Sequence, residues 1–419
     1  MIAIVVGAGI NGVTAAIELN KRGHKVILVD PGPLPHPLAA STDISKAVRA
    51  AYGADEDYTA LAERSIELWH EWNREFGVEL YHEIGFLFLR QRQMQPGDFE
   101  YESLKVLERR GHKVERINPE QLRENFPAWN AEHYADGFLD RNAGYVESGR
   151  VVAKLIERAK SLGVELREGQ FAELAQKNGR VTGVVLQDRY APVILSEVEE
   201  SRGRTFEAAS RDPSTALGMT RVAGDVVVMA VGAWTPYLLP FTKKFFRATG
   251  HAVFHLKPSQ PKLFAPERFP IFGADISTTG FYGFPLNRDG VVKIARHGPG
   301  REMSPDSAER VVTAEEEEQM REFVRSTFPA LADAPIVYGR ICLYCDTYDG
   351  HFWIAPDPER PGLIIATGDS GHGFKFAPVL GEIIADAAED KHNPLLEKFR
   401  WRPEVRPGIE KEAARYQPE

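Results

Sequence analysis

The chain of 419 residues carries a net charge of −9, and its pI is about 5.8. This acidic balance argues against nucleic acid as a partner and against a basic face for membrane binding. No apolar run approaches the roughly 20 residues that a membrane-spanning helix needs, and the two cysteines are too few for a disulfide framework. We therefore expect a cytoplasmic protein with two domains, without nucleic-acid or membrane partners.

The first thirty residues contain the clearest motif. An apolar strand-like run at 2–6 leads into Gly7-Ala-Gly9-Ile-Asn-Gly12, then into a helical pattern and a second apolar run that ends in Asp30. Gly7 permits a tight turn, Gly9 lets the backbone approach a pyrophosphate, and Gly12 lets the helix pack close to the strand. The Asp30 carboxylate can accept hydrogen bonds from a ribose 2′-hydroxyl. The motif predicts a dinucleotide bound at a helix N-terminus.

The spacing of apolar residues predicts the elements that follow. A period near 3.6 is typical of helices, and alternation or a short apolar run is typical of strands. Helices are expected at about 58–76, 100–110 and 151–162, and strands at 85–89, 164–167 and 181–186.

Residues 189–222 do not fit their surroundings. This polar stretch separates the strand at 181–186 from an apolar strand at 226–230, whereas a hairpin of roughly 2–5 residues would normally join such strands. Long insertions are tolerated because the entropy of loop closure grows slowly with length. We interpret the segment as a surface insertion of little functional value.

Strand, glycine turn and helix recur twice more along the chain. One apolar run at 226–231 ends in a glycine, and another at 362–366 leads through a glycine-rich turn into an apolar helix at 379–388. The stretch between them, about 237–335, is rich in Phe, Pro and strand-like runs and has an acidic helix near 313–327. One domain is therefore expected to consist of discontinuous pieces, with a second domain interleaved.

Four patches carry a resemblance to a known family. They are the N-terminal fingerprint, Lys46-Ala-Val-Arg49-Ala-Ala-Tyr52-Gly, Tyr282-Gly-Phe-Pro285 with Lys293-Ile-Ala-Arg-His297, and Arg340-Ile-Cys342-Leu-Tyr with Gly371-His-Gly-Phe-Lys375. With them, nearly the whole chain outside 189–222 resembles the flavin-dependent amine oxidases of the D-amino-acid-oxidase superfamily. The most similar branch contains monomeric sarcosine oxidase, N-methyltryptophan oxidase, and the fructosyl-amino-acid and saccharopine oxidases. The stretches that look more like the last two are Asp43-Ile-Ser-Lys-Ala-Val-Arg49 and Gly368-Asp-Ser-Gly-His-Gly.

The resemblance implies an α/β fold. A Rossmann-like FAD-binding domain of the glutathione-reductase type is expected to interleave with an α+β substrate domain on a mostly antiparallel sheet. The expected boundaries are 1–84, 145–236 and 340–395 for the FAD-binding domain, 85–144 and 237–339 for the substrate domain, and 396–419 for a C-terminal tail.

Cys342 and Cys345 form a C-x-x-C pair with several possible roles. A redox dithiol usually opens a helix after a strand, and that context is lacking here. A zinc site needs two more ligands at compatible spacing, and no second pair exists, so no metal is predicted. A flavin thioether needs one thiolate, and a buried structural cysteine needs no partner. The resemblance selects the thioether, with the 8α-methyl carbon of FAD joined to Cys342.

The resemblance also assigns roles around a substrate. Arg49 and Lys375 form a clamp for a substrate carboxylate, which arginine can bind in bidentate fashion and which a lysine at a helix N-terminus also attracts. Lys293 is the cation that activates oxygen near flavin N5, and Tyr282 and His297 line the substrate pocket. Taken alone, Lys375 and Lys293 could be lysines on a solvent-exposed face, and Tyr282 and His297 would more often be core residues.

Lys46 departs from sarcosine oxidase, in which an arginine stands over the flavin face, so the electrostatics of that face and the substrate preference stay open. The expected cofactor-binding residues are Gly7, Gly9, Ile10, Asn11, Gly12, Asp30, Ser41, Thr42, Lys46, Gly232, Trp234, Cys342, Gly368, Gly371, Gly373, Phe374 and Lys375.

The expected activity is that of an FAD-dependent oxidase of secondary or N-substituted amino acids. Hydride passes from the carbon next to nitrogen to FAD, the imine hydrolyses, and O2 is reduced to H2O2. The alternative is a dehydrogenase of a D- or cyclic amino acid that passes its electrons to a quinone or another acceptor. The expected partners are the amino acid and O2, and a monomer is the default state.

Overall fold

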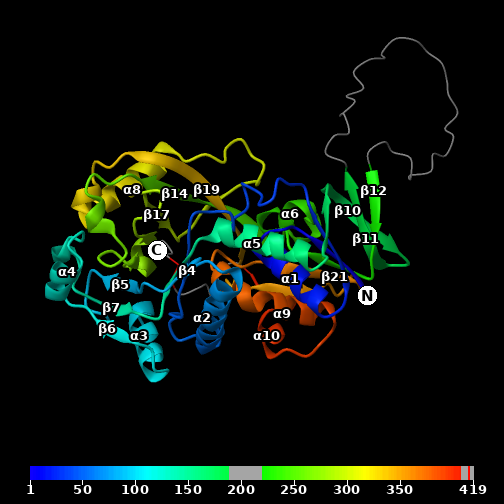
Figure 1. The fold of residues 1–419 in the computed structure, drawn as a ribbon, viewed down its shortest axis with the longest axis horizontal. Helices are drawn as coiled ribbons and strands as arrows, with labels where there is room; N and C mark the ends of the chain where they lie inside the picture. The colour runs from blue at the N-terminus through cyan, green and yellow to red at the C-terminus, as the bar shows by residue number, and fades with distance from the viewer. Residues whose placement is uncertain (188–218, 407–413, 416–419) are drawn as a thin grey trace, which may run out of the picture.

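The computed structural model describes residues 1–187, 219–406 and 414–415 (Figure 1). The strands within these ranges form four sheets, two of them large. No helix in these ranges is long and apolar enough to cross a lipid bilayer. The parallel and antiparallel sheets, with helices packed on them, confirm the predicted α/β fold class.

The first large sheet is built on the N-terminal fingerprint. Its parallel strands, in spatial order, are β21 (Leu363–Thr367), β13 (Val226–Met229), β1 (Ile2–Val6), β2 (Lys25–Asp30) and β9 (Glu165–Glu168), and β20 (Trp353–Pro356) pairs antiparallel at one edge. Parallel sheets are usually covered on both faces, which explains why β1, β13 and β21 are almost entirely apolar, whereas the edge strand β9 carries charged residues. The central strand β1 is buried from Ala3 to Val6.

Helices cover one face of this sheet, and a small sheet covers the other. Ala3 and Val5 pack with the apolar side chains of α1 (Ile10–Lys21), α5 (Ser148–Ser161) and α9 (Ala377–Ala388). Ile4 and Val6 point the other way, toward the antiparallel meander of β10 (Gln170–Lys177), β11 (Arg180–Gln187) and β12 (Met219–Ala223). Figure 1 shows this meander at one end of the molecule.

The second large sheet is mostly antiparallel. Its strands, in spatial order, are β18 (Arg301–Glu302), β14 (Phe246–Leu256), β17 (Val292–Arg296), β16 (Phe281–Phe284), β15 (Ile271–Ala274), β5 (Phe86–Arg90), β7 (Asp136–Asp140) and β6 (Val114–Arg116), and β19 (Ile336–Thr347) also pairs with β14. One of its pairs, β15 with β5, is parallel. A separate aromatic core that includes Trp129, Phe272 and Phe328 packs on this sheet.

The remaining elements complete the two halves. A small sheet consists of β3 (Lys46–Val48), β8 (Gly144–Val146) and β4 (Tyr81–His82). The other helices are α2 (Glu56–Phe76), α3 (Phe99–Arg109), α4 (Pro119–Asn125), α6 (Thr235–Leu238), α7 (Ile276–Thr279), α8 (Ala314–Thr327) and α10 (Pro394–Lys398).

The predicted helices at 58–76, 100–110, 151–162, 313–327 and 379–388 are confirmed as α2, α3, α5, α8 and α9, with ends that differ by a few residues. Local chemistry explains the boundaries. The Asp55 carboxylate accepts a hydrogen bond from the Tyr58 amide at the start of α2, and Gly77 ends that helix in a left-handed conformation. Thr313 and Glu316 form a reciprocal capping box at the start of α8.

The predicted insertion at 189–222 requires a correction at its C-terminal end. Residues 219–222 belong to β12, which pairs antiparallel with β11, so the hairpin partner of β11 is β12 rather than the strand at 226–229. The rest of the predicted insertion, up to residue 218, lies outside the described residues.

The proposed domain boundary near 340 falls inside a strand. β19 pairs with β14 from Ile336 to Thr347, so residues 340–347 belong to the large antiparallel sheet. Of the other expected boundaries, the one at 84/85 falls between β4 and β5, whereas those at 144/145, 236/237 and 395/396 fall inside β8, α6 and α10. The division into an FAD-binding and a substrate domain stays a prediction.

The junction of β1 and α1 depends on two close backbone approaches. Gly7 has a φ of +98°, which L side chains rarely adopt, and a Cβ there would lie 2.5 Å from the Ala230 carbonyl oxygen. A Cβ on Gly12 would lie 1.8 Å from the Gly7 carbonyl oxygen. These contacts hold α1 directly against the end of β1 and the neighbouring β13.

We expect Gly12→Ala to lower the free energy of unfolding by about 1–3 kcal/mol, because the added methyl group meets backbone atoms that cannot move independently. Gly339→Ala is the control, since a Cβ there meets its nearest atom at 3.5 Å. Denaturant unfolding of both variants measures the difference. Equal stabilities would show that α1 can shift to accept the methyl group.

Candidate active site

A cavity of about 360 Å³ lies at the carboxyl ends of the parallel strands. The turn after β1, the end of β2, the turn after β13 and the glycine-rich turn after β21 contribute to its wall. The predicted cofactor-binding residues that line it are Gly7, Gly9, Ile10, Asn11, Asp30, Ser41, Lys46, Gly232, Trp234, Gly371, Gly373 and Phe374.

The N-terminus of α1 opens into this cavity with its backbone amides uncapped. Gly9 occupies the N-cap position, no side chain caps the helix, and no acidic residue lies in its first turn. Unpaired amides and the positive end of the helix dipole together favour a bound anion such as a phosphate. A cap or an acidic side chain here would compete with that anion.

Asp30 is held rigidly at the end of β2. Its Oδ2 accepts a hydrogen bond of 2.8 Å from the Ala8 amide, and its Oδ1 accepts one of 2.9 Å from the Gly32 amide. Each carboxylate oxygen can accept a further hydrogen bond. The carboxylate therefore has capacity left for the ribose hydroxyls of a nucleotide.

The other predicted cofactor residues do not line this cavity. Gly12 and Gly368 instead shape the backbone behind it, Thr42 lies beside Ser41, and Lys375 lines a second cavity. Cys342 also lies outside the lining, whereas Cys345 is part of it. The Cys342 Sγ lies 3.7 Å from the Nζ of Lys46.

A smaller cavity of about 60 Å³ adjoins the first, and the two share Lys46, Tyr344, Gly371 and Phe374. The smaller cavity brings together four residues that the sequence analysis assigned to substrate binding, and these are Arg49, Tyr282, His297 and Lys375. They come from four separate stretches of the chain. Their assembly around one small space is the central geometric result for the site.

Two buried cations face this smaller cavity. Arg49 and Lys375 are each 5% exposed. The Lys375 Nζ donates to the Tyr52 hydroxyl and to the His372 carbonyl oxygen, both at 2.8 Å, and Arg49 donates to the Ala51 carbonyl. An anionic ligand in the smaller cavity would interact favourably with both cations.

Tyr52 and His372 extend the network behind Lys375, and the sequence analysis missed both. The Tyr52 hydroxyl lies 3.1 Å from His372 Nδ1, and His372 Nε2 lies 2.9 Å from the Gly350 carbonyl oxygen. Because a carbonyl can only accept, Nε2 donates to it, and Nδ1 of a neutral imidazole accepts from the tyrosine. The tyrosine oxygen is then oriented to accept from Lys375.

Lys293 does not line either cavity. Its Nζ donates to Asp43 Oδ2 at 2.7 Å and to the Ser45 carbonyl oxygen at 2.6 Å, and its side chain is 1% exposed. Burial lowers the pKa of Lys293 to about 8, a shift that Lys46 increases and that Asp43 opposes. The predicted oxygen-activating lysine thus lies outside the cavity walls, whereas Lys46 is part of them.

Asp369 is a third residue that the sequence analysis missed. Its carboxyl group lines the larger cavity. Burial, together with the negative charge of Asp346, raises the pKa of Asp369 to about 6, against the opposing charges of Lys46 and Lys375. The feature of the sequence that could have identified Asp369 is an acidic residue inside the glycine-rich turn that starts at Gly368.

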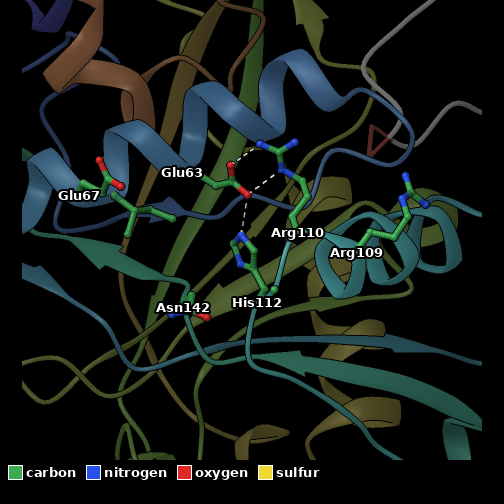
Figure 2. A pocket seen from close by; sticks show the side chains of 8 residues that line it. Glu63, Glu67, Arg109, Arg110, His112 and Asn142 are labelled. Carbon is green, nitrogen blue, oxygen red and sulfur yellow. Dashed lines mark hydrogen bonds and ion pairs between the residues drawn. The ribbon is translucent and has the colours of Figure 1, made fainter.

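A separate open groove of about 560 Å³ lies between α2 and the loop after α3 (Figure 2). Glu63 and Glu67 of α2 line it together with Arg109, Arg110 and His112. Glu63 accepts hydrogen bonds from Arg110 at 2.6 Å and pairs with His112 at 3.0 Å. None of the predicted site residues lines this groove, and Glu63 already has two partners, Arg110 and His112.

The chain is similar to known FAD-dependent oxidoreductases. Residues 3–387 match the profile of the family described as FAD dependent oxidoreductase (DAO). The chain is 27% identical over 389 residues to a monomeric sarcosine oxidase of Arthrobacter sp. (strain TE1826). The aligned residues make up 92% of this chain and 91% of that protein. It is 26% identical over 434 residues to the L-saccharopine oxidase of Schizosaccharomyces pombe, with 95% and 92% covered.

A solved structure also matches over most of the chain. This is the fructosyl amine:oxygen oxidoreductase (Amadoriase I) of Aspergillus fumigatus, with a TM-score of 0.76 and 25% sequence identity. The match covers 96% of this chain and 89% of that one.

We expect Tyr52→Phe to lower the free energy of unfolding by about 1–3 kcal/mol, because buried polar groups of Lys375 and His372 each lose a hydrogen-bond partner. Tyr338→Phe is the control, since that side chain is 49% exposed and its loss should change stability by less than about 0.5 kcal/mol. Denaturant unfolding followed by tryptophan fluorescence measures both. A Tyr52→Phe variant as stable as the control would contradict the network.

Proposed function

The chain belongs to the family of FAD-dependent oxidoreductases, whose profile spans residues 3–387, and we propose that it oxidises the C–N bond of secondary or N-substituted amino acids. The resemblance found in the sequence is thereby confirmed at the level of the family. The names of the relatives refer to sarcosine, saccharopine and fructosyl amines. The observation that carries the proposal is the cavity that brings Arg49 and Lys375 together beside the larger cavity.

The residues of the larger cavity suit FAD. The uncapped N-terminus of α1 would hold the pyrophosphate, and the Asp30 carboxylate would accept from the ribose hydroxyls. FAD supplies the two-electron acceptor for oxidation of an amine. The smaller cavity shares Lys46 and Tyr344 with this one, so a substrate there would lie next to the cofactor.

Arg49 and Lys375 would bind the substrate carboxylate and so fix the position of the carbon next to nitrogen. Holding a reactant in one orientation accounts for a large share of the rate enhancement when the cofactor carries the reactive chemistry. Tyr282 and His297 would form the wall around the amine. The imine product would then hydrolyse to an amine and a carbonyl compound.

Lys293 favours an oxidase over the alternative dehydrogenase. A fixed positive charge stabilises the negative charge that develops as dioxygen accepts electrons, and a dehydrogenase has no need of it. At a pKa of about 8, most Lys293 side chains are protonated at neutral pH. We therefore propose H2O2 as the second product.

We also propose that FAD is joined covalently through its 8α-methyl carbon to Cys342. The support is the resemblance and the position of the sulfur beside Lys46, next to residues that line the larger cavity. A cytoplasmic monomer is proposed from the low cysteine content and from the monomeric relatives in the matched branch.

The direct test mixes the purified protein with a panel of N-alkyl, cyclic, opine-type and fructosyl amino acids. Anaerobic loss of the flavin absorbance near the visible maximum reports amine oxidation, and peroxide formed in air reports the oxidase reaction. Flavin bleaching without peroxide would indicate the dehydrogenase. No bleaching with any member of the panel would reject the substrate class.

We expect Lys375→Met to reduce kcat/KM for the best substrate about 100-fold, because a charge-assisted contact to its carboxylate is lost. The carboxamide of the same substrate should lose little, since it carries no negative charge. Lys105→Met, an exposed lysine, is the control. Equal losses for acid and amide would mean that Lys375 does not bind the carboxylate.

Denaturation in acid tests the covalent bond and identifies its cysteine. We expect the yellow colour of the wild-type protein to stay in the precipitate, that of Cys342→Ala to pass into the supernatant, and that of Cys345→Ala to stay with the protein. Burial raises the pKa of Cys345 to about 12, which makes its thiol a poor nucleophile. Release of the flavin by Cys345→Ala alone would transfer the assignment to that residue.

A further inference from the structure

A single buried carboxylate, that of Asp43, lies close to both Lys46 and Lys293. The side chain of Asp43 is 1% exposed and lies in the loop before β3. Its Oδ2 is 2.7 Å from the Nζ of Lys293, on β17, and 3.5 Å from the Nζ of Lys46, on β3. None of the patterns in the sequence assigned a role to Asp43.

Asp43 is ionised because of its neighbours. Burial alone would raise the pKa of Asp43, but the charges of Lys293 and Lys46, the hydrogen bond from Lys293 and the more distant Arg340 hold it well below its usual range. His255 Nε2 lies 3.9 Å from Oδ1, and burial lowers the pKa of His255 to about 4, so this imidazole is neutral near pH 7. One negative charge therefore balances several cations.

The lysines depend on this charge in return. Lys293 is surrounded by Asp43, Lys46 and Cys342, and burial and Lys46 both favour its neutral form. Lys46 also faces Tyr282 and Arg340, and without the cofactor Cys342 and Asp43 raise its pKa against the effect of burial. A thioether at Cys342 is uncharged, so in the holoenzyme Asp43 would be the remaining anion. Of the two nearby groups that favour protonated Lys293, Asp43 has the larger effect and is the one in direct contact with its ammonium.

We propose that Asp43 is the shared counter-ion that keeps Lys46 and Lys293 protonated beside the flavin cavity, and that it thereby sets the pH range in which the reduced cofactor reacts with dioxygen. The inference rests on the proposed role of Lys293 as the oxygen-activating cation. Dioxygen receives two electrons and one proton from the reduced flavin and one proton from solvent, which gives H2O2 and oxidised FAD. Asp43 exchanges neither electrons nor protons in this step and is a positioning residue.

The experiment needs no amine substrate. The flavin of the holoenzyme is reduced by light without oxygen, mixed with oxygenated buffer, and followed by its returning absorbance between about pH 6 and pH 9, the range that brackets the Lys293 titration. The variants are Asp43→Asn, Asp43→Glu and Lys293→Met. The matched control is Asp357→Asn, which removes another buried carboxylate that pairs with an arginine, Arg360, at 3.1 Å and lines neither cavity.

We expect Asp43→Asn to slow reoxidation about tenfold or more at neutral pH and to move the midpoint of the pH profile down by at least about one unit, because the neutral amine is favoured once the carboxylate is lost. Asp43→Glu keeps the charge and should keep the wild-type midpoint, as should Asp357→Asn. A profile for Asp43→Asn that coincides with the wild type would overturn the proposal. So would an equal loss in Asp43→Glu, since a charge effect cannot explain it.

The pH dependence of unfolding gives a measurement independent of the oxygen reaction. A lysine whose pKa is lower in the folded than in the unfolded state adds stability as the pH rises from the folded to the unfolded value. For Lys293 this window begins at about pH 8. It should begin lower in Asp43→Asn and disappear in Lys293→Met.

The failures can be told apart. Slow reoxidation in Lys293→Met with an unchanged Asp43→Asn profile rejects the counter-ion alone. Unchanged reoxidation in Lys293→Met rejects the oxygen-activating role on which it rests. If Asp43→Asn does not fold, the wild-type and Lys293→Met profiles are compared. The proposal requires an inflection in the wild-type profile that is absent from the Lys293→Met profile, and a wild-type profile without an inflection rejects it.

Discussion

The close approach of α1 to the end of β1 is the constraint from which the site follows. Gly12 lies so near the Gly7 carbonyl that only a hydrogen fits between them, and this brings the free amides of α1 to the carboxyl edge of the parallel sheet. The same edge receives Asp30 from β2 and the turns after β13 and β21. Ligands of open α/β sheets bind at such an edge, because successive parallel strands deliver their loops to it. The position of the larger cavity is a consequence of this packing.

The smaller cavity lies where segments of the two halves of the chain come together. β3 carries Lys46 into the larger cavity and places Arg49, just beyond its end, in the smaller one. Tyr282 and His297 reach the same space from β16 and from the end of β17, and Lys375 reaches it from the turn before α9. Neither sheet alone holds all of these groups. The interleaved chain order thus lets one small cavity combine the cations Lys46, Arg49 and Lys375 with the aromatic side chains of the antiparallel sheet.

The sequence predicted the elements whose formation depends on residues that are near one another in the chain. Glycine spacing, caps and apolar periodicity identified the first βαβ unit and helices such as α2 and α8. The resemblance brought Arg49 and Lys375 together before any geometry was known. The long pairing of β14 with β19 was not predicted, because it depends on partners far apart in the chain. The bond from Lys375 to Tyr52 spans 323 residues and was missed for the same reason.

The position of Lys293 shows most clearly what a motif leaves out. Its assignment to oxygen came from the resemblance, but the fold places Asp43 against it, and Lys46, which lies near the same carboxylate, lines the cavity in its place. Arginine stays charged in any protein environment, whereas the pKa of a buried lysine moves readily with its surroundings. The charge of a lysine at position 46 therefore depends on its surroundings, whereas the charge of the arginine in sarcosine oxidase does not. With lysines at both positions, the charge beside the cofactor depends on their counter-ion, so the character of this flavin face is decided as much by Asp43 as by the cations themselves.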